Sequence, residues 1–435
     1  MERNTPLPSL HARLTTHSAR IAVVGLGYVG IATVGQLLSE GHRVFAFERD
    51  AEQRKKLTVG PWPFPDDAGE LFSLVTSAML EGRLTIHEAP LDNQSFDVCV
   101  LCTETPAPLG QFDSEPLRAA LELARGAIPE LLVVQSTLPA GTMEGLVSSV
   151  FGDCSGLLVY APVRVMPGRL LENTRALRRV VGVAEAQRAP ATLAMCALFA
   201  STAAHLDFVD FTTAELVKLA ENAYRDAQIA LANEIALLCG DAGGDFWRVR
   251  ELVNAVPGRA LALPGPGVGG ACLPKDTWLL LGSGERSSSS RPSLLEAARA
   301  INLSMPEHIA QALVRALPFA GKHAEIAVLG VTYRENCAVT RDSPAQAVIE
   351  LLTKQCEGAT LRVHDPKAAP GDLPSVVRGA DAVLVLVRHD AYRGLDWQAL
   401  AKEMRGQLVF DACGVVSADD LAGTDLVLAG LGRGA

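Results

Sequence analysis

Residues 20–50 read RIAVVGLGYVGIATVGQLLSEGHRVFAFERD. The stretch opens with a short apolar run, turns at a glycine-rich segment, continues as a helical pattern that ends at Gly41, and closes on a second apolar run. This order of strand, turn, helix and strand is a βαβ unit, in which the two strands lie parallel in one sheet. It predicts a doubly wound α/β domain with a parallel sheet early in the chain.

The glycines of this turn have the spacing of a dinucleotide-binding site. Gly25 makes the turn, Gly27 lets the backbone approach a pyrophosphate, and Gly30 allows the helix to pack closely. Glu48 ends the second strand, where a carboxylate accepts ribose hydroxyls and repels a 2′-phosphate. We therefore expect NAD, in preference to NADP, although a tight turn in an α/β protein that binds a different ligand at this edge is the alternative. The turn residues expected at the cofactor are Gly25, Gly27, Tyr28, Val29 and Gly30.

Similar patterns organise the rest of the chain. Further apolar runs, FDVCVL, ELLVVQST, GLLVYAPV and RRVVGV, extend the first sheet to about residue 205. Residues 212–244 form one long helical pattern rich in alanine and leucine, which we expect to link domains and to provide a dimer surface. After an expected flexible loop at 283–293 and a further helix over 294–317, the βαβ rhythm restarts near His323 in AEIAVLGVTY, ATLRVHDP, ADAVLVLVRHD and QLVFDACGVV. The expected division is a mobile tail over 1–19, an NAD-binding Rossmann domain over 20–205, a helical middle and dimerisation domain over 206–318, and a second Rossmann-like domain over 319–435.

Composition excludes several classes of protein. A net charge of −10 disfavours nonspecific nucleic-acid binding, and no apolar run reaches the roughly 18 residues of a membrane span. The first twenty residues lack the apolar core of a signal peptide, so a cytoplasmic protein is expected. Nine scattered cysteines form no disulfide framework. We interpret the close pair Cys99 and Cys102 as small buried apolar residues, and we expect no metal site.

Polar residues at two places are candidates for chemistry. Thr105 and Thr137 each follow an apolar strand, at the edge where doubly wound sheets bind ligands, and their hydroxyls can hold a phosphate or a water. Lys218, Asn222 and Arg225 share one face of the long helix. The alternatives are threonines that cap turns and a helix face that is merely solvated.

The segment PGPGVGGACLPKD, residues 264–276, sets Cys272 among glycines. We expect the glycines to admit a bulky ligand, with Lys275 and Asp276 supplying charge and a candidate base beside a nucleophilic thiolate. An ordinary turn with an unreactive cysteine is the alternative. An anionic ligand would also require arginine and lysine to gather locally on this acidic chain.

Six motifs, in their order along the chain, resemble the UDP-glucose/GDP-mannose dehydrogenase family: GLGYVG, KLAENAYRD, PGPGVGGACLPKD, ARAINLSMPE, VTYRENCAVTRDSPA and RHDAY. The resemblance covers residues 20 to about 420. It implies two Rossmann-like domains joined by a long-helix middle domain, a homodimer, and a UDP-sugar-binding role for residues 319–435. It also implies an NAD-dependent four-electron oxidation of a nucleotide sugar at C6, through a thiohemiacetal and a thioester, that supplies a uronic acid for polysaccharide biosynthesis.

The resemblance assigns roles to individual residues. Cys272 is the implied nucleophile, Lys218 and Asn222 stabilise an oxyanion or move its proton, and Asp276 and Thr137 position the base and the water. The implied contacts to the nucleotide sugar are Arg164, Val165, Lys218, Asn222, Arg225, Gly269, Tyr333, Arg334 and Arg341, with Arg259 contributed across the dimer.

The segment YAPVRVMPGR, residues 160–169, bears on the choice of substrate. Arg164, Pro167 and Gly168 match the branch that oxidises UDP-N-acetylhexosamines, so UDP-N-acetylmannosamine or its gluco isomer is expected. Lys275 matches the UDP-glucose 6-dehydrogenase branch, which is the alternative, and Ala271 stands where the acetylhexosamine branch has histidine. Val163 replaces the family's glutamate, which is implicated in thioester cleavage. A nucleotide-sugar-binding protein with impaired catalysis is therefore the alternative from another class.

Overall fold

The computed structural model describes residues 8–88, 95–151, 156–282 and 293–434, with the side chains of residues 109, 319 and 320 left out. The chain forms two compact units: unit 1 is Met1–Glu221 with Trp278–Ser287, and unit 2 is Asn222–Thr277 with Ser288–Ala435. The boundaries after Glu221 and after Thr277 each fall within a helix, and the three domains expected from the sequence stay a prediction. Apart from Ser293, the expected flexible loop over 283–293 lies outside the described residues.

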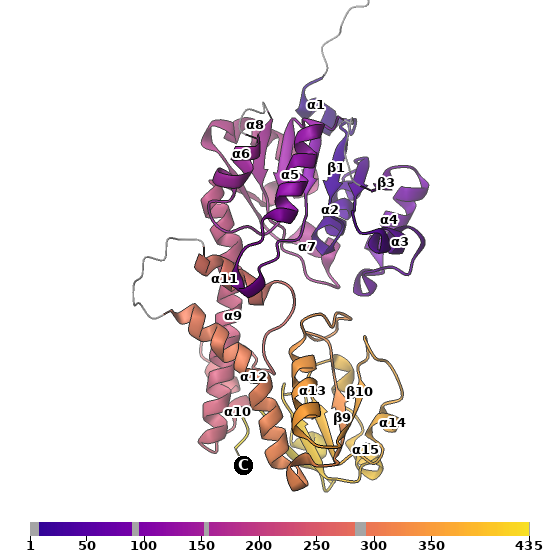
Figure 1. Ribbon diagram of the computed structural model, residues 1–435, viewed down its shortest axis with the longest axis vertical. Helices are drawn as coiled ribbons and strands as arrows, with labels where there is room; N and C mark the ends of the chain where they lie inside the picture. The colour runs from indigo at the N-terminus through magenta and orange to yellow at the C-terminus, as the bar shows by residue number, and fades with distance from the viewer. Residues whose placement is uncertain (1–7, 89–94, 152–155, 283–292, 435) are drawn as a thin grey trace, which may run out of the picture. The chain divides into compact units, whose positions relative to one another are not determined.

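Unit 1 is built on an eight-stranded sheet with the order β3-β2-β1-β4-β5-β6-β7-β8 (Figure 1). Its strands are β1 (Ile21–Val24), β2 (Val44–Phe47), β3 (Leu84–His87), β4 (Val98–Leu101), β5 (Leu131–Val134), β6 (Leu157–Tyr160), β7 (Arg179–Val183) and β8 (Leu206–Val209). The predicted doubly wound α/β fold is confirmed, but the expectation of an all-parallel sheet is wrong at β7, which pairs antiparallel with β6. A strand that is buried on both faces reads as the same apolar run in either direction, so its sequence does not reveal its orientation.

Helices cover both faces of this sheet because its strands are apolar on both sides. In β1, Ile21 and Val23 belong to one buried cluster, with residues of α2, α4 and α8, whereas Ala22 and Val24 belong to another, with residues of α5. The helices of unit 1 are α1 (Leu10–Thr15), α2 (Tyr28–Ser39), α3 (Ala51–Val59), α4 (Glu70–Leu80), α5 (Glu115–Ala127), α6 (Ser148–Phe151), α7 (Leu170–Ala176) and α8 (Arg188–Leu198).

The short helix α1 corrects the predicted mobile tail. Leu10 and Leu14 are buried, and the Arg13 guanidinium pairs with Asp97, at 3.1 Å, and with Glu130. The prediction is therefore wrong for the described part of the tail. Two leucines four positions apart form one apolar helix face, a signal too short to stand out in the sequence.

Unit 2 contains the second Rossmann-like sheet, with five parallel strands in the order β10-β9-β11-β12-β13. The strands are β9 (Glu325–Leu329), β10 (Thr360–His364), β11 (Ala382–Val385), β12 (Leu408–Asp411) and β13 (Val427–Gly430). Its remaining helices are α10 (Phe246–Asn254), α12 (Leu294–Ala316), α13 (Pro344–Gln355), α14 (Leu373–Val377) and α15 (Trp397–Glu403). The chain passes between the units within α9 (Phe211–Asp241) and α11 (Leu273–Gly282). The long helices predicted over 212–244 and 294–317 are confirmed as α9 and α12.

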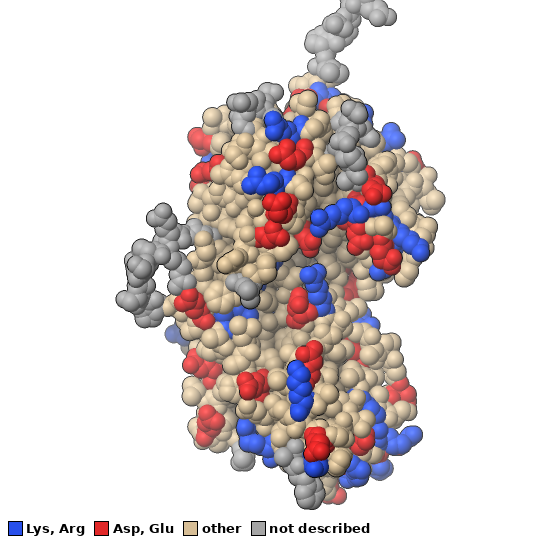
Figure 2. Space-filling model, viewed as in Figure 1, with Lys and Arg blue, Asp and Glu red and all other residues tan. Residues whose placement is uncertain are grey.

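The sequence disfavours nonspecific nucleic-acid binding and a membrane span, and the surface charge and the helices can be compared with these two expectations. On the face shown in Figure 2, acidic and basic side chains are interspersed. Among the described helices, none is both long and apolar enough to cross a membrane.

Candidate active site

The glycine turn between β1 and α2 has the geometry that a dinucleotide requires. Gly25 has φ +89°, and a Cβ there would lie 2.8 Å from the carbonyl oxygen of Cys102. A Cβ on Gly30 would lie 1.8 Å from the carbonyl oxygen of Gly25, so these two glycines are required by the fold itself. Gly27 is exposed and has no neighbour within 4 Å of its Cβ position. The middle glycine therefore leaves the approach to the backbone open.

Glu48 lies beside this turn. Its carboxylate accepts hydrogen bonds from the backbone N–H of Leu26 at 2.7 Å and of Asp50 at 3.0 Å. No side chain caps the N-terminus of α2 at Gly27, so the first N–H groups of this helix are directed at an incoming anion. These residues fit NAD, with the pyrophosphate at the start of α2 and a ribose at Glu48.

Thr105 and Thr137 lie beyond the carboxyl ends of neighbouring parallel strands. Thr105 follows β4 and is buried, and Thr137 follows β5 and is half-buried. The two loops are tied together because the Ser136 hydroxyl donates to the carbonyl oxygen of Thr103 at 2.7 Å. Both threonines thus lie at the edge of the sheet where the glycine turn also lies.

Cys99 and Cys102 are not reactive groups. Both are buried, and burial raises the pKa of each thiol to about 12. The interpretation of this pair as small apolar core residues is confirmed.

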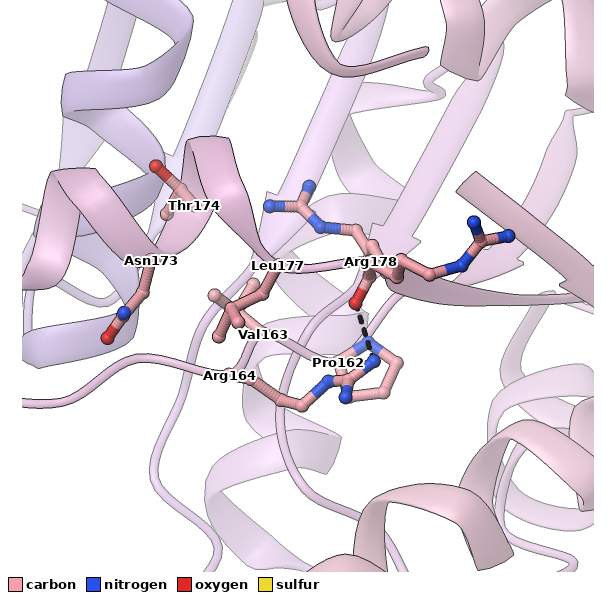
Figure 3. Close-up of a pocket in the computed structure, with 8 residues that line it drawn as sticks. Pro162, Val163, Arg164, Asn173, Thr174, Leu177 and Arg178 are labelled. Carbon is pink, nitrogen blue, oxygen red and sulfur yellow. Dashed lines mark hydrogen bonds between the residues drawn. The ribbon is translucent and has the colours of Figure 1, made fainter. Parts of the chain in front are cut away.

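Val163 borders a cavity of about 10 Å³ in unit 1 (Figure 3). The side chain is buried, and the cavity is lined also by Arg164, Asn173, Thr174, Arg178 and Arg179. Among the described residues, no acidic side chain lines it. Arg164 donates to the Arg178 carbonyl and pairs with Glu221 at 3.5 Å. Glu172, a candidate substitute for the missing glutamate, is instead largely exposed and 4.0 Å from Arg169.

The second half of the predicted site is the loop before α11. Cys272 is exposed and directly precedes this helix, and its carbonyl oxygen accepts from the backbone N–H of Asp276 at 2.9 Å. The N-terminal end of a helix favours a negative charge, which suits a thiolate at this position. Asp276 is buried between the Nζ of Lys275, at 2.5 Å, and the Nδ2 of Asn222, at 2.6 Å. Because both carboxylate oxygens are engaged, Asp276 is placed to orient its two partners.

The glycines of this loop are required by packing within the protein. A Cβ on Gly269 would lie 2.2 Å from the carbonyl oxygen of Asp342, and one on Gly270 would lie 2.8 Å from the ring of Tyr333. A Cβ on Gly267 would lie 2.9 Å from the carbonyl oxygen of Asn302. Protein atoms thus occupy the space that a Cβ would need at all three positions, whereas the role of these glycines in admitting a ligand stays a prediction.

Tyr333 and Arg334 are carried by the loop after β9. Burial raises the pKa of Tyr333 to about 12, with Cys272 among the neighbours that add to the shift. The Arg334 guanidinium lies 5.9 Å from the centre of the Tyr333 ring. Both side chains therefore belong to the surroundings of the Cys272 loop within unit 2.

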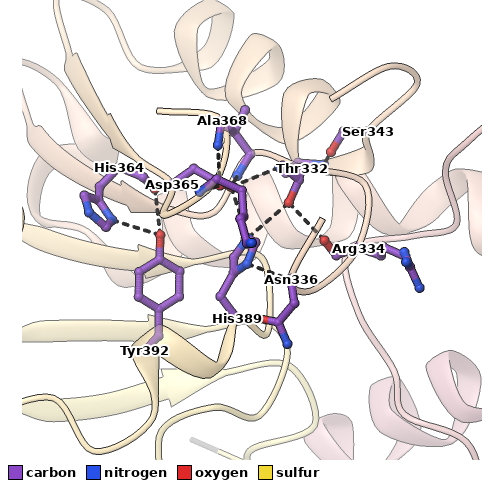
Figure 4. Close-up of polar contacts among 12 residues, drawn as sticks. Thr332, Arg334, Asn336, Ser343, His364, Asp365, Ala368, His389 and Tyr392 are labelled. Carbon is purple, nitrogen blue, oxygen red and sulfur yellow. Dashed lines mark hydrogen bonds and ion pairs between the residues drawn. The ribbon is translucent and has the colours of Figure 1, made fainter. Parts of the chain in front are cut away.

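A cluster of buried polar side chains holds the loop after β9 in place (Figure 4). Asp365 accepts from the backbone N–H of Val331 at 2.8 Å and of Thr332 at 3.2 Å. Nδ1 of His389 accepts from the backbone N–H of Asn336 at 3.0 Å, so its Nε2 carries the proton that is shared with Asp365 at 3.1 Å. The VTYREN and RHDAY segments are thereby joined by hydrogen bonds.

Comparison with known proteins decides what these features belong to. The UDP-glucose/GDP-mannose dehydrogenase family matches through its NAD binding domain at residues 19–202, its central domain at 212–304 and its UDP binding domain at 327–418. UDP-N-acetyl-D-mannosamine dehydrogenase from Pyrococcus horikoshii is 32% identical over 431 residues, which cover 95% of this chain and 99% of the relative. The chain belongs to the UDP-glucose/GDP-mannose dehydrogenase family.

Solved structures agree with this assignment. The structure of the Pyrococcus horikoshii UDP-D-ManNAc dehydrogenase has a TM-score of 0.84 at 31% identity, covering 95% of this chain and 99% of that one. A UDP-glucose dehydrogenase from Pyrobaculum islandicum has a TM-score of 0.82 at 26% identity, covering 100% of this chain and 99% of that one. As a member of the family, the protein is an NAD-binding nucleotide-sugar dehydrogenase, and its UDP binding domain implies a UDP-sugar substrate.

The structure divides the predicted site residues between the two units. Unit 1 carries the glycine turn, Glu48, Thr105, Thr137, Arg164, Val165 and Lys218, and unit 2 carries Asn222, Arg225, Arg259, Gly269, Cys272, Asp276, Tyr333, Arg334 and Arg341. Arg225, Arg259 and Arg341 are exposed, and Arg341 pairs with its neighbour Asp342 at 3.5 Å.

Sequence reasoning missed several buried acids of this dehydrogenase, namely Glu215, Asp226 and Asp365. Glu215 and Asp226 lie on α9 among apolar positions, and an acid at a buried helical position is the signal that could have identified them. The partners of Asp226 and Asp365 are remote in sequence, which no local pattern reveals.

Proposed function

We propose that the protein oxidises a UDP-N-acetylhexosamine, UDP-N-acetylmannosamine first, at C6 to the uronic acid through a covalent intermediate on Cys272. The observation that carries this proposal is the Cys272 loop, where an exposed cysteine at a helix N-terminus lies next to the buried Asp276 and its two partners, Lys275 and Asn222. An ordinary alcohol dehydrogenase has no need of such a nucleophile.

The cofactor assignment rests on the glycine turn. Bound there, NAD supplies the hydride acceptor for both two-electron oxidations. Gly27 and the start of α2 would hold the pyrophosphate, and Glu48 would hold the ribose. Thr105 and Thr137 lie at the same edge of the sheet, where their hydroxyls suit the cofactor and the hydrolytic water.

The chain's own groups provide the remaining chemistry. Lys218 takes the proton of the C6 alcohol as the hydride leaves, and the Cys272 thiolate then adds to the aldehyde carbon. Asn222 donates to the resulting oxyanion, and the second hydride loss leaves a thioester. Attack by water on its carbonyl carbon breaks the C–S bond, regenerates the thiolate and releases the carboxylate. Asp276 acts by fixing the amide of Asn222 at 2.6 Å.

Several observations support the substrate. Arg164, Pro167 and Gly168 follow the acetylhexosamine pattern, and the relative that is 32% identical is named a UDP-N-acetyl-D-mannosamine dehydrogenase. The groups proposed to bind the anionic nucleotide sugar are Arg164, Val165, Lys218, Asn222, Arg225, Gly269, Tyr333, Arg334 and Arg341, with Arg259 from a second subunit of a homodimer.

Val163 favours a second candidate function, that of a nucleotide-sugar-binding protein with impaired catalysis. A buried valine neither takes nor holds a proton, and within the described residues the cavity beside it has no acidic lining. This candidate predicts tight binding of the UDP-sugar with little or no turnover.

A substrate panel separates these functions. The purified protein is supplied with NAD and, in turn, UDP-N-acetylmannosamine, UDP-N-acetylglucosamine, UDP-glucose and GDP-mannose, while NADH is followed by absorbance. We expect the fastest NADH formation with UDP-N-acetylmannosamine. In the Cys272→Ala variant, only the first oxidation, from alcohol to aldehyde, should form NADH, because the second requires the adduct on Cys272. Binding by calorimetry without NADH from any sugar would establish the second candidate. A sugar adduct on Cys272 in the intact mass would identify an enzyme stalled at the thioester.

A further inference from the structure

A buried polar cluster in unit 2 joins α9, α11 and α12. Its members are Asp226 and Asn233 on α9, Thr277 on α11, and Arg299 and Asn302 on α12, each at most 1% exposed. A charged pair buried this completely is uncommon unless every charge is matched. The cluster contains none of the residues assigned to the reaction.

The contacts centre on the carboxylate of Asp226. Nη1 of Arg299 and Nδ2 of Asn302 each donate to its Oδ1 at 2.8 Å. Nδ2 of Asn302 also lies 3.0 Å from the carbonyl oxygen of Asp226. Nδ2 of Asn233 donates to Oδ1 of Asn302 at 3.0 Å. The side chains of the two long helices are thus held in one arrangement.

The same cluster binds both ends of the loop that carries Cys272. Oδ1 of Asn233 accepts from the backbone N–H of Gly265 at 2.9 Å, before the cysteine. Oδ2 of Asp226 accepts from the hydroxyl of Thr277 at 3.2 Å, after it. A Cβ on Gly267 would lie 2.9 Å from the carbonyl oxygen of Asn302, so the loop also packs directly on α12.

Stability alone does not account for this cluster. Two charges lose their hydration on burial, and well-packed apolar side chains of similar volume are often as stabilising or more so. What an apolar replacement does not provide is the directional hydrogen bonding to Thr277 and, through Asn302 and Asn233, to Gly265.

We propose that Asp226 and Arg299 are positioning residues that hold the Cys272 loop in its reactive arrangement. This proposal rests on the proposed function, because it concerns the geometry of the same nucleophile. A displacement of about 1 Å at a reacting atom lowers a rate by about 100-fold, so the effect falls on the chemical step.

The test replaces the charged pair by apolar side chains of similar size, Asp226→Leu with Arg299→Met. The matched control is Arg378→Met with Glu403→Leu, an exposed pair in the same unit at 2.8 Å. For each variant we would measure thermal unfolding, kcat and KM for the UDP-sugar, and the rate of Cys272 alkylation by iodoacetamide, by peptide mass. We expect the buried-pair variant to fold, with kcat lower by about 100-fold, KM changed far less, and an altered alkylation rate.

Wild-type kcat and alkylation in a folded buried-pair variant would overturn the proposal. If that variant does not fold, Thr277→Val carries the same test, because it removes the hydroxyl that donates to Asp226 at 3.2 Å and lies 3.4 Å from the carbonyl oxygen of Leu273, and leaves the charged pair in place. It should lower kcat by about 10-fold, as loss of one hydrogen bond predicts, and an unchanged kcat with unchanged alkylation would refute the role. If the wild-type protein oxidises no UDP-sugar, the proposed function fails, whereas the alkylation rates still decide whether the cluster positions Cys272.

Discussion

At the scale of single residues, we expect Val163 to limit the last proposed step, the hydrolysis of the thioester on Cys272. Without the family glutamate, some other group has to accept a proton from the attacking water. Glu172 does not suit this role, because its side chain is largely exposed and paired with Arg169. Arg164 and Arg179 line the cavity next to Val163, and Arg164 already pairs with Glu221 at 3.5 Å.

Restoring the acid should speed thioester cleavage. Val163→Glu is expected to raise the rate of product release by about 100-fold or more, the usual contribution of a general base. The measurement is single-turnover quench followed by intact mass of the Cys272 adduct, with Val163→Gln as the control of similar size. Equal adduct decay in wild type and Val163→Glu would show that this position does not limit the step.

Glu215 is a second residue with a measurable consequence. It is fully buried on α9, and its carboxylate accepts from the backbone N–H of Gly141 at 2.7 Å and of Met143 at 2.8 Å. Burial raises its pKa to about 7, against the opposing effect of these hydrogen bonds. The group thus fixes the segment that follows Thr137, and it changes charge near neutral pH.

The pH dependence follows from that shift. Because the folded-state pKa lies above the ordinary value of 4.5, the folded protein binds more protons between these values, and the stabilisation is complete below pH 4.5. It declines as pH rises through about 7, by at most about 3 kcal/mol. The midpoint temperature of thermal unfolding should therefore fall more steeply for wild type than for Glu215→Gln as the pH rises from 5 to 8, because the amide of glutamine does not titrate. Parallel profiles would exclude a raised pKa at Glu215.

At the scale of elements, α9 presents an apolar stripe. Val217, Tyr224, Leu231 and Leu238 are spaced by seven residues and are 39%, 65%, 52% and 60% exposed. A seven-residue spacing keeps side chains on one helix face, the arrangement by which helices pair. Such a stripe on a soluble helix indicates an interface, and we assign it to the proposed homodimer.

A charge in this stripe should separate the subunits. Leu231→Glu is expected to give monomers in light scattering, because a dimer would bury the carboxylate among apolar side chains. Leu80→Glu on α4 is the control, since Leu80 is 86% exposed and lies away from the stripe in sequence. A wild-type monomer, or a Leu231→Glu protein of dimer mass, would contradict the assignment.

The strands that the sequence predicts are those with strong apolar runs, such as β1, β4, β5 and β11, which are buried throughout. The strands β3, β8 and β13 escape prediction because they are mostly half-exposed, so they form no strong apolar run. The direction of β7 is set by how the chain returns to the sheet, which hydrophobicity does not encode.

The candidate site shows the same division. The glycine turn and the Cys272 loop are predictable because each is a short contiguous segment with a physical rationale. The pairing of Asp226 with Arg299 joins residues 73 positions apart, and on the long helix a polar residue reads as solvated until its partner is known. The packing of Gly269 against Asp342 and of Gly270 against Tyr333 likewise joins residues that are remote in sequence, so the spacing of the glycines does not reveal it.

At the scale of the whole molecule, the proposed chemistry needs groups from both units: the dinucleotide turn belongs to unit 1, and Cys272 belongs to unit 2. The net charge of −10 leaves the nucleotide sugar dependent on local arginines, of which Arg164, Arg334 and Arg341 are proposed contacts. Because binding is electrostatic, KM for the UDP-sugar should rise with salt, whereas the ratio of NADH to sugar should not change.

That ratio is the most direct test of the central claim, a four-electron oxidation through Cys272. With excess NAD and limiting UDP-N-acetylmannosamine, NADH is measured at completion and the sugar product is identified by mass. The account predicts two NADH per UDP-sugar and a uronic acid product. One NADH per sugar with an aldehyde product would contradict it.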